Sequence, residues 1–387
     1  VAHAAADGAL VVNAQAHVGN VRRLRLHYGG RARAWQSHGQ APPRPLSVCP
    51  MSSPELATLL LPFASGALRL PEAGRALFLR AEPAPELLPL GDRLTCVQGF
   101  RPTFAALEAA GFRTVPEAGE EGCALALVLL SKHKAAALGD LALALARLAP
   151  GGTLVAAGRG DAGAQPILRK LRAACGEAAE LSKHHCRVAW LTRPAELPSE
   201  VAEWAAAARP QPVAITGAIA APGVFGWDKI DAGSALLAEA LDSRIKGRVA
   251  DFGAGWGYLS REILARCPGV KTLALIEAEH AALAAAKRNV AAPEGVALEF
   301  LWRDAAADRL GPYDWIVSNP PFHAGKGGDP EIGRAFIRAA RRALRPRGRL
   351  LLVANRHLPY EATLAQAFRA VRTVAESAGF KVIEAET

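Results

Sequence analysis

Cysteine is scarce in this chain of 387 residues, and the six cysteines are scattered without a Cys-x-x-Cys pair. Zinc sites built from cysteine need clustered ligands, and disulfide frameworks belong mostly to short secreted chains. His184, His185 and Cys186 adjoin, but neighbouring residues of a strand point to opposite faces and do not easily share one ion. We therefore expect free thiols in a reducing compartment and no metal site.

Segments with the composition of a secretion signal or a membrane-spanning helix are also lacking. The first residues do not combine a charged region with an apolar core. The stretch from Pro210 to Trp227 carries no charge, but it holds three prolines and three glycines, which do not suit a spanning helix. We expect a cytoplasmic protein without a membrane partner.

Acidic residues are fewer than basic ones, 36 against 46, and the net charge is +10. Such a balance favours a polyanionic partner, although a GC-rich coding sequence would also enrich arginine. The composition, 51% hydrophobic and 21% charged, is that of an ordinary globular protein. The length is sufficient for two domains, each with its own buried core.

The second half alternates short apolar runs with helical patterns. The run Lys246–Phe252 enters a glycine turn and is followed by a helix over Tyr258–Arg266. Strands alternating with helices of this length predict a parallel sheet that is covered on both faces. The further elements that we expect are strands at Lys271–Ile276, Val296–Leu301, Trp315–Ser318 and Arg349–Ala354, and helices at His280–Val290 and Pro330–Leu344.

The first half repeats this plan. The run Leu127–Lys134, a helix and the run Leu148–Gly158 mirror the later strand, helix and strand around Ser318. We interpret this as an internal duplication of one α/β domain. The strand Leu94–Gln98 leads into a turn with a single glycine, and Lys132 and His133 are expected where the second half has Asn319 and Pro320. The first copy is therefore predicted to be degenerate, with the linker at 194–222.

The glycine turn of the second half predicts a cofactor site. Asp251, Gly253, Gly255 and Gly257 follow the first strand with GxGxG spacing, whereas dinucleotide-binding turns have GxGxxG. Glu277 ends the second strand, where a carboxylate can accept both hydroxyls of a ribose. Asp304 follows the third strand and is placed to accept from an adenine amine. Together these residues predict an adenosine-binding site.

After the fourth strand come Asn319, Pro320, Pro321 and Phe322. The prolines fix two φ angles and bias Asn319 away from helix, which holds its side chain and the Pro320 carbonyl outward. Two such acceptors would grip the hydrogens of an exocyclic base amine and aim its lone pair at a methyl donor. Phe322 offers a flat face on which an extruded base can stack. A structural turn with a core phenylalanine is the alternative.

With these motifs, the region from Gly223 to the C-terminus resembles the bacterial ribosomal RNA guanine-N2 methyltransferases, the RsmC/RlmG group. Further matching pieces are Gly223–Phe225, Asp231–Ser234 and Val353–Glu361. The resemblance implies two tandem class I, Rossmann-like, seven-stranded methyltransferase domains: a degenerate one over 51–193 and a catalytic one over 223–387. It also implies that S-adenosylmethionine is the methyl donor.

By this resemblance each motif residue receives a role. Asn319, Pro320, Pro321 and Phe322 would hold the target guanine, and Phe225 and Asp231 would close over the donor. The donor would be bound by Asp251, Gly253, Gly255, Gly257, Glu277, Asp304 and Asn319. The implied partner is ribosomal RNA, with 16S rRNA or the 30S subunit preferred, and the chain is expected to act as a monomer.

Other functions stay open from sequence alone. A 23S rRNA guanine is the first alternative. Protein-glutamine and DNA-adenine methyltransferases also use an Asn/Asp-Pro-Pro loop, generally with tyrosine in place of Phe322. A non-enzymatic RNA-binding scaffold with a vestigial fold is a third class. The seven arginines between Asp329 and Arg349 would track RNA phosphates or form a solvated helix face.

Residues 1–50 hold six arginines and one acid, and the only methionine of the chain is Met51. One interpretation is that this basic leader precedes the natural start at Met51. The other is a basic RNA-binding arm. Sequencing the N-terminus of the native protein distinguishes them.

Overall fold

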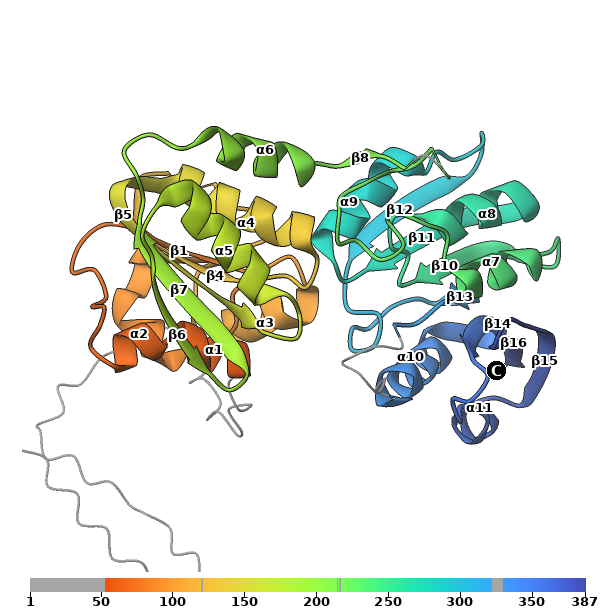
Figure 1. Cartoon of the computed structure of the whole chain (residues 1–387). Helices are drawn as coiled ribbons and strands as arrows, with labels where there is room; N and C mark the ends of the chain where they lie inside the picture. The colour runs from red at the N-terminus through yellow and green to blue at the C-terminus, as the bar shows by residue number, and fades with distance from the viewer. Residues whose placement is uncertain (1–52, 120, 214, 216, 322–329) are drawn as a thin grey trace, which may run out of the picture. The chain divides into compact units, whose positions relative to one another are not determined.

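The computed structural model describes residues 53–387 apart from 120, 214, 216 and 322–329 (Figure 1). The basic leader, Met51 and Phe322 therefore lie outside the described residues. Within that part of the chain, no helix has both the length and the apolar character needed to cross a bilayer.

The first half forms a sheet of seven strands in the order β3-β2-β1-β4-β5-β7-β6 (Figure 1). The strands from β3 to β5 run parallel, and β7 is antiparallel to both of its neighbours. The strands are β1 (Ala76–Leu79), β2 (Leu94–Val97), β3 (Thr114–Val115), β4 (Cys123–Leu129), β5 (Leu148–Arg159), β6 (Ala179–Lys183) and β7 (Cys186–Thr192).

Helices cover both faces of this sheet because successive residues of its buried strands point to opposite faces. Leu77 and Leu79 of β1 face one core, whereas Ala76 and Phe78 face the other. The first core is closed by α4 (Lys134–Arg147), α5 (Ala164–Cys175) and α6 (Ser199–Ala207). The second is closed by α1 (Pro54–Leu59), the 3-10 helix Pro85–Arg93 and α3 (Arg101–Ala109), and the short helix α2 (Leu61–Ala64) follows α1.

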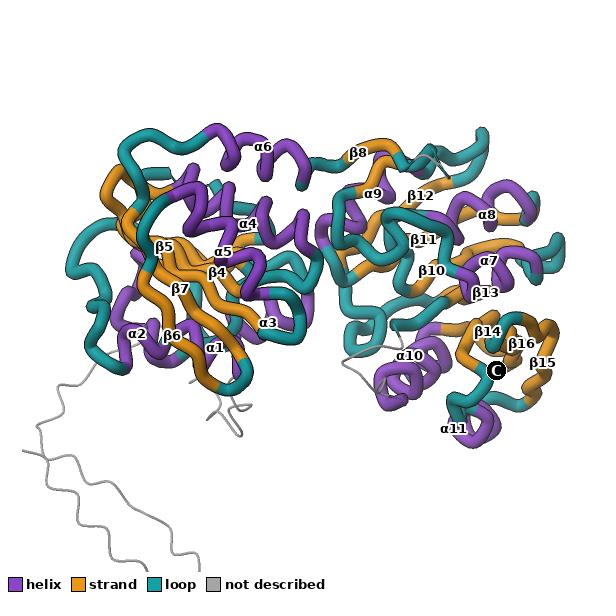
Figure 2. The backbone as a smooth tube through the Cα atoms, in the orientation of Figure 1, coloured by secondary structure: helices purple, strands orange, loops and turns teal. Residues whose placement is uncertain are grey.

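The second half repeats the same topology, β12-β11-β10-β13-β14-β16-β15 (Figure 2). Its strands are β10 (Lys246–Phe252), β11 (Gly269–Glu277), β12 (Ala297–Trp302), β13 (Tyr313–Ser318), β14 (Leu344–Asn355), β15 (Ala370–Ser377) and β16 (Phe380–Glu386). Its helices are α7 (Ala232–Glu239), α8 (Tyr258–Arg266), α9 (His280–Asn289), α10 (Pro330–Ala343) and α11 (Glu361–Ala367). The predicted pair of α/β domains is confirmed by this repeated strand order.

Helices again form a layer on each face of the second sheet. The core that contains Ala250 and Phe252 of β10 is closed by α10 and α11. The core that contains Val249 is closed by α7, α8 and α9. Because β10, β11 and β13 are parallel, the loops that follow them meet at one edge of the sheet.

The segment expected to be a plain linker, 194–222, has structure of its own. Val201 and Trp204 of α6 pack into the first core, so that domain continues beyond residue 193. The hairpin of β8 (Gln211–Pro212) and β9 (Ile219–Ala220) then contacts the second domain. Asn289 of α9 accepts from the Ile219 N–H at 2.8 Å and donates to its carbonyl at 3.0 Å.

Candidate functional site

The glycine turn after β10 adopts a backbone that side chains disfavour. Gly253, Gly255 and Gly257 have φ values of 78°, 56° and 95°. A Cβ at Gly257 would lie 2.4 Å from Cγ2 of Val290, so glycine lets α8 begin this close to the end of α9. A Cβ at Gly255 would meet nothing within 4 Å. The middle glycine therefore borders open space beside the turn.

Asp251 lies beneath this turn with no exposed surface. Its Oδ2 accepts from Ser260 Oγ at 2.7 Å, whereas its Oδ1 has no hydrogen-bond partner among the described residues. Burial raises the pKa of Asp251 to about 7. A buried carboxylate with an orphan oxygen is costly unless a hydrogen-bond donor or a cation meets it. The amino group of an S-adenosylmethionine molecule has this chemistry, so the turn fits that donor.

Glu277, at the end of β11, joins the turns that follow the first two strands. Its Oε2 accepts from the Gly255 N–H and its Oε1 from the Glu279 N–H, both at 2.8 Å. Burial raises the pKa of Glu277, and these backbone donors oppose that shift. The carboxylate is thus held in one orientation with lone pairs left for a diol.

Asp304 is placed differently from the other predicted donor-binding residues. Its Oδ1 accepts from the Ala306 N–H at 2.8 Å, within its own loop. Neither Asp304 nor the buried Asp251 lines the two cavities that border the glycine turn. The hydrogen bond from the Gly255 N–H joins Glu277 to the glycine turn, whereas the adenine role of Asp304 stays a sequence-based prediction.

Asn319 follows β13 at the same edge of the sheet. Its Nδ2 donates to Asp231 Oδ2 at 2.9 Å and to Ser234 Oγ at 2.7 Å. Asp231 is the N-cap of α7 and also accepts from the Ser234 N–H at 2.9 Å. Both hydrogens of the Asn319 amide have acceptors, so its Oδ1 is the atom left to accept from a ligand.

The geometry around Asn319 adds contacts that the sequence did not predict. Asp231, expected to close over the donor, accepts from Asn319 across 88 positions of sequence and lines the small pocket beside the glycine turn. Ser234 was not predicted as a site residue, although the sequence Asp231–Ser234 already marked its segment. Pro320 is buried and Pro321 exposed.

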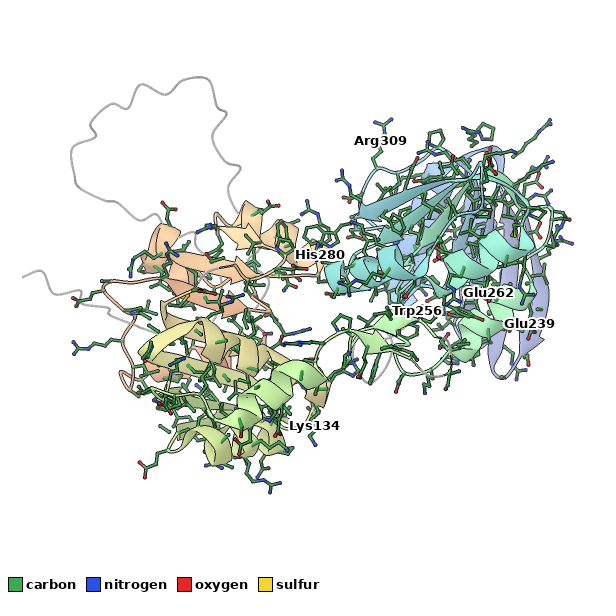
Figure 3. All side chains as sticks on the ribbon, turned by 90° about the horizontal axis from the view of Figure 1, so that it is seen from above. Lys134, Glu239, Trp256, Glu262, His280 and Arg309 are labelled. Carbon is green, nitrogen blue, oxygen red and sulfur yellow. The ribbon has the colours of Figure 1, made fainter. Side chains whose placement is uncertain are left out.

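A cavity joins these groups. Phe225, which is 65% exposed, lines a small pocket together with Gly253, Gly255 and Asn319. Phe225 and Gly255 also line a cleft of about 600 Å³ that reaches Glu277. Trp256 lies in the turn between Gly255 and Gly257 (Figure 3), and its indole N–H donates to the Gly226 carbonyl at 3.0 Å. The cationic lining of the cleft comes from the first domain, from Arg80, Lys132 and Arg159, and His133 lies among them.

Strand pairing aligns the two domains residue by residue. In the first domain Leu79 of β1 pairs with Val97 and Val128. In the second domain Phe252 of β10 pairs with Ile276 and Ser318, so Leu79 and Phe252 occupy equivalent positions. Arg80, Gln98 and Leu129 thus stand where the second domain has Gly253, Glu277 and Asn319. The expectation that Lys132 and His133 occupy the positions of Asn319 and Pro320 is therefore wrong, because the register places Leu129 and Leu130 there.

Gln98 occupies the position in the first domain that Glu277 occupies in the second, and its side chain is an uncharged amide. Its Oε1 accepts from the Phe100 N–H at 2.8 Å, as Glu277 does from Glu279. Its Nε2 donates to the Ala81 carbonyl at 2.8 Å. An amide in this orientation presents no carboxylate to a diol, which agrees with a degenerate first domain.

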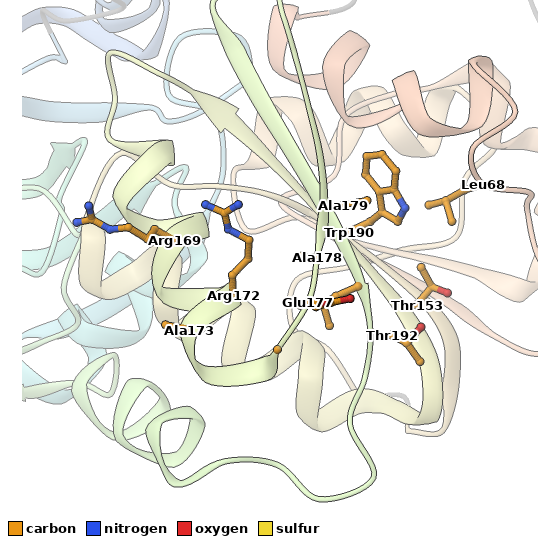
Figure 4. Close-up of a pocket in the computed structure, with 12 residues that line it drawn as sticks. Leu68, Thr153, Arg169, Arg172, Ala173, Glu177, Ala178, Ala179, Trp190 and Thr192 are labelled. Atoms are coloured by element: carbon orange, nitrogen blue, oxygen red, sulfur yellow. The ribbon is translucent and has the colours of Figure 1, made fainter.

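A larger open cavity, of about 1150 Å³, lies elsewhere in the first domain (Figure 4). Thr153 near the start of β5 and Trp190 of β7 line it, beside Arg172 near the end of α5. This is the edge at which the parallel strands begin, opposite the edge that carries the motifs. Cavity size alone therefore does not locate the site.

Comparison with known proteins found a family model, curated relatives and a solved structure that resemble this chain. The family model described as "Methyltransferase small domain" matches residues 216–384. The ribosomal RNA small subunit methyltransferase C of Shewanella amazonensis is 33% identical over 259 residues, covering 66% of this chain and 75% of the relative. The protein of the same name from Pseudomonas paraeruginosa is 34% identical over 264 residues, covering 67% and 78%.

A solved structure covers both domains. The T. thermophilus 16S rRNA N2 G1207 methyltransferase (RsmC), in complex with AdoMet and guanosine, superposes with a TM-score of 0.67 and 28% identity. The match covers 83% of this chain and 90% of that one. The two tandem domains of this chain thus have a counterpart in a solved structure.

Proposed function

Because the chain belongs to the family of ribosomal RNA small subunit methyltransferases C, we propose that it methylates the exocyclic N2 of one guanine in 16S rRNA. Membership confirms the prediction of an S-adenosylmethionine-dependent rRNA methyltransferase. The finer proposal is that Asn319 and Pro320 hold the guanine amine, with the base flipped out of its stack.

The single observation that carries this proposal is the fixed amide of Asn319. An exocyclic guanine amine is a poor nucleophile because its lone pair is delocalised into the ring. With its Nδ2 engaged by Asp231 and Ser234, Asn319 presents Oδ1 as an acceptor for one amine hydrogen. The Pro320 carbonyl would accept the other. Gripping both hydrogens turns the lone pair out of conjugation and orients it for attack.

S-adenosylmethionine, when bound, supplies an electrophilic sulfonium methyl group. In this proposal Asp251 receives its amino group, and Gly253 and Gly255 allow the backbone to approach closely. Glu277 accepts its ribose hydroxyls, and Phe225 covers the pocket that Asn319 also lines. No strong base is required of the protein, because the amine becomes acidic once it is methylated.

The test compares Asn319→Ala with Ser234→Ala. We expect Asn319→Ala to lower kcat by about a hundredfold or more, as loss of a positioned polar group does. Ser234→Ala removes only one of the two amide acceptors, so its loss should be about tenfold. Because Asn319 is only one of several predicted donor contacts, donor affinity, measured by calorimetry, should fall far less than kcat in either variant. The readout is tritium transfer to 16S rRNA, naked and in 30S subunits.

The outcomes also separate the rival functions. Undiminished methylation by Asn319→Ala overturns the role of Asn319. Transfer to 23S rRNA, DNA or a glutamine-containing peptide in place of 16S rRNA changes the substrate class. A wild-type protein that binds RNA but no S-adenosylmethionine leaves only the scaffold function. In a strain lacking the protein, a map of rRNA should lose one N2-methylguanine.

A further inference from the structure

The turn that carries Glu277 is bound to the first domain through its backbone. Phe100, which follows β2, and Glu279, which follows β11, form an antiparallel bridge. The Arg101 N–H donates to the Ala278 carbonyl at 2.8 Å, and the His280 N–H donates to the Gly99 carbonyl at 2.9 Å. Each segment is thus fixed by the main chain of the other.

Side chains close the contact around Trp302. Its indole N–H donates to the Gly99 carbonyl at 3.1 Å and to the Ala278 carbonyl at 2.8 Å. Phe104 of α3 meets the Trp302 ring edge-on at 4.8 Å, and the Arg101 guanidinium lies 5.2 Å from the ring centroid. Aromatic and cation–π contacts of this kind add to the backbone hydrogen bonds.

Gly99 leaves space for this approach. A Cβ at Gly99 would lie 2.7 Å from Glu279 Oε1, with Glu279 Cδ and His280 Cβ both 3.8 Å away. The carboxylate oxygen can move aside for a single methyl group, but a branched side chain would also press on the turn itself. Gly119 of the same domain has no atom within 4 Å of its Cβ position and no positive φ, so it serves as a matched control.

The two segments are equivalent positions of the duplicated fold. Counting on from Gln98 and Glu277, Gly99 corresponds to Ala278 and Arg101 to His280. The two hydrogen bonds between the segments are therefore counterparts of one another. Such reciprocity is typical of an isologous interface, in which the same surface meets itself.

We infer that the first domain is a positioning element for donor binding, and that Gly99–Arg101 fixes the turn that orients the Glu277 carboxylate. This inference rests on the proposed role of Glu277. Glu277 Oε1 accepts from the Glu279 N–H, and Glu279 is the residue bridged to Phe100. Because the turn is already held in its binding geometry, donor binding does not have to order it, and the free-energy cost of binding is lower. The degenerate domain thus contributes to donor affinity through the turn that it fixes.

The test deletes one hydrogen bond of the bridge. Arg101 is the first residue of α3, where proline is tolerated, and Phe100 has an extended backbone that suits a residue before proline. Arg101→Pro removes both the N–H and the side chain, whereas Arg101→Ala removes only the side chain. We expect Arg101→Pro to raise the donor Kd about fivefold to tenfold above that of Arg101→Ala.

Steady-state kinetics should distinguish Arg101→Pro from Arg101→Ala in the same way. For Arg101→Pro the KM for S-adenosylmethionine rises, whereas the KM for rRNA and kcat at saturating donor stay at the values of Arg101→Ala. Gly99→Val should behave like Arg101→Pro, and Gly119→Val like the wild type. A contact that serves packing alone would lower Tm in Arg101→Pro and Gly99→Val and leave the donor Kd unchanged. That result overturns the inference.

The controls keep this result separate from the proposed function. A wild-type chain that binds no S-adenosylmethionine removes the proposed donor site. If Glu277→Gln keeps the wild-type donor affinity, Glu277 has no role in donor binding. A third outcome is that Glu277→Gln loses donor binding, whereas Arg101→Pro and Gly99→Val keep the wild-type donor affinity. This outcome overturns only the positioning role of the first domain.

Discussion

Asp251 is a carboxylate in a place where its charge is unfavourable in the absence of a ligand. It has no exposed surface, and Ser260 satisfies only one of its two oxygens. Burial raises its pKa, hydrogen bonds from Ser260 lower it, and the charge of Glu277 raises it further. In the proposed function a donor ammonium that reaches Oδ1 removes this penalty, so relief of a buried charge would supply part of the proposed binding energy.

Asp251→Asn tests this through the pH dependence of stability. The pKa of Asp251 is about 7 in the folded chain. It is about 3.9 in the unfolded chain. The folded chain therefore holds the proton more tightly, and the free energy of unfolding falls as pH rises from 4 to 7. Between pH 5 and 8 the wild type should lose roughly 2–3 kcal/mol more than the variant, measured by urea denaturation without donor.

The same variant should bind S-adenosylmethionine more weakly at pH 8, where the wild type is ionised. Ser260→Ala is the control for loss of the hydrogen bond, since it leaves the carboxylate in place. Parallel stability curves for wild type and Asp251→Asn would show that this carboxylate is not the source of the slope.

The sequence predicts those candidate site residues whose signal is local. The glycines and Glu277 follow strands at regular intervals, and Asn319 precedes a double proline. It did not find Ser234, because its bond to Asn319 joins positions 85 residues apart. It also misaligned Lys132 with Asn319, because apolar runs do not reveal the register of a strand with its neighbours.

Among the elements, β10 and α8 have the bounds that the sequence predicts. β14 begins at Leu344 rather than Arg349, because Leu344 already pairs with Tyr313 of β13, and the turn through Pro346 and Gly348 is an irregularity before Arg349 pairs with Trp315. The final hairpin, β15 and β16, was not predicted. β15 is largely exposed, and an exposed edge strand lacks the apolar alternation on which such predictions depend.

The junction of α8 and α9 at Gly257 is the tightest contact of the glycine turn. Gly257→Ala should destabilise the chain by about 2–4 kcal/mol, because a positive φ is strained and Val290 must move. Gly295→Ala is the matched control, since Gly295 has φ 81° and no atom within 4 Å of its Cβ position. It should cost only about 1–2 kcal/mol. Equal losses in urea denaturation would show that contact with Val290 contributes nothing.

Over the whole molecule, the net positive charge is not gathered on the arginine-rich segment. Arg345 pairs with Asp314 at 2.8 Å, and Arg349 pairs with Glu384 and Glu386 at 3.0 and 2.8 Å. Both lie where β14 begins, at the edge opposite Asn319. Arg334 and Arg338 pair with Glu331 on α10. The segment is therefore a poor candidate for one continuous phosphate track.

Cations at the motif edge come from both domains. Lys132 is exposed and lines the cleft. Phe225 and Gly255 line both this cleft and the small pocket that Asn319 lines. Beside it, burial and then the charge of Lys132 lower the pKa of His133, which favours its neutral form. Arg356 is exposed after β14, at the same edge as Asn319. The rRNA strand that delivers the guanine would meet these cations.

Charge reversal at the cleft tests this placement. Lys132→Glu should raise the KM for 16S rRNA about tenfold and reduce the slope of log K against log salt by about 1, as loss of one phosphate contact does. Arg347→Glu is the control, because Arg347 is equally exposed but lies in the turn at the opposite edge of the sheet. Both variants should keep the wild-type Kd for S-adenosylmethionine. If both raised the KM equally, net charge rather than the cleft would govern the approach of RNA, because steering by overall charge does not depend on which edge carries it.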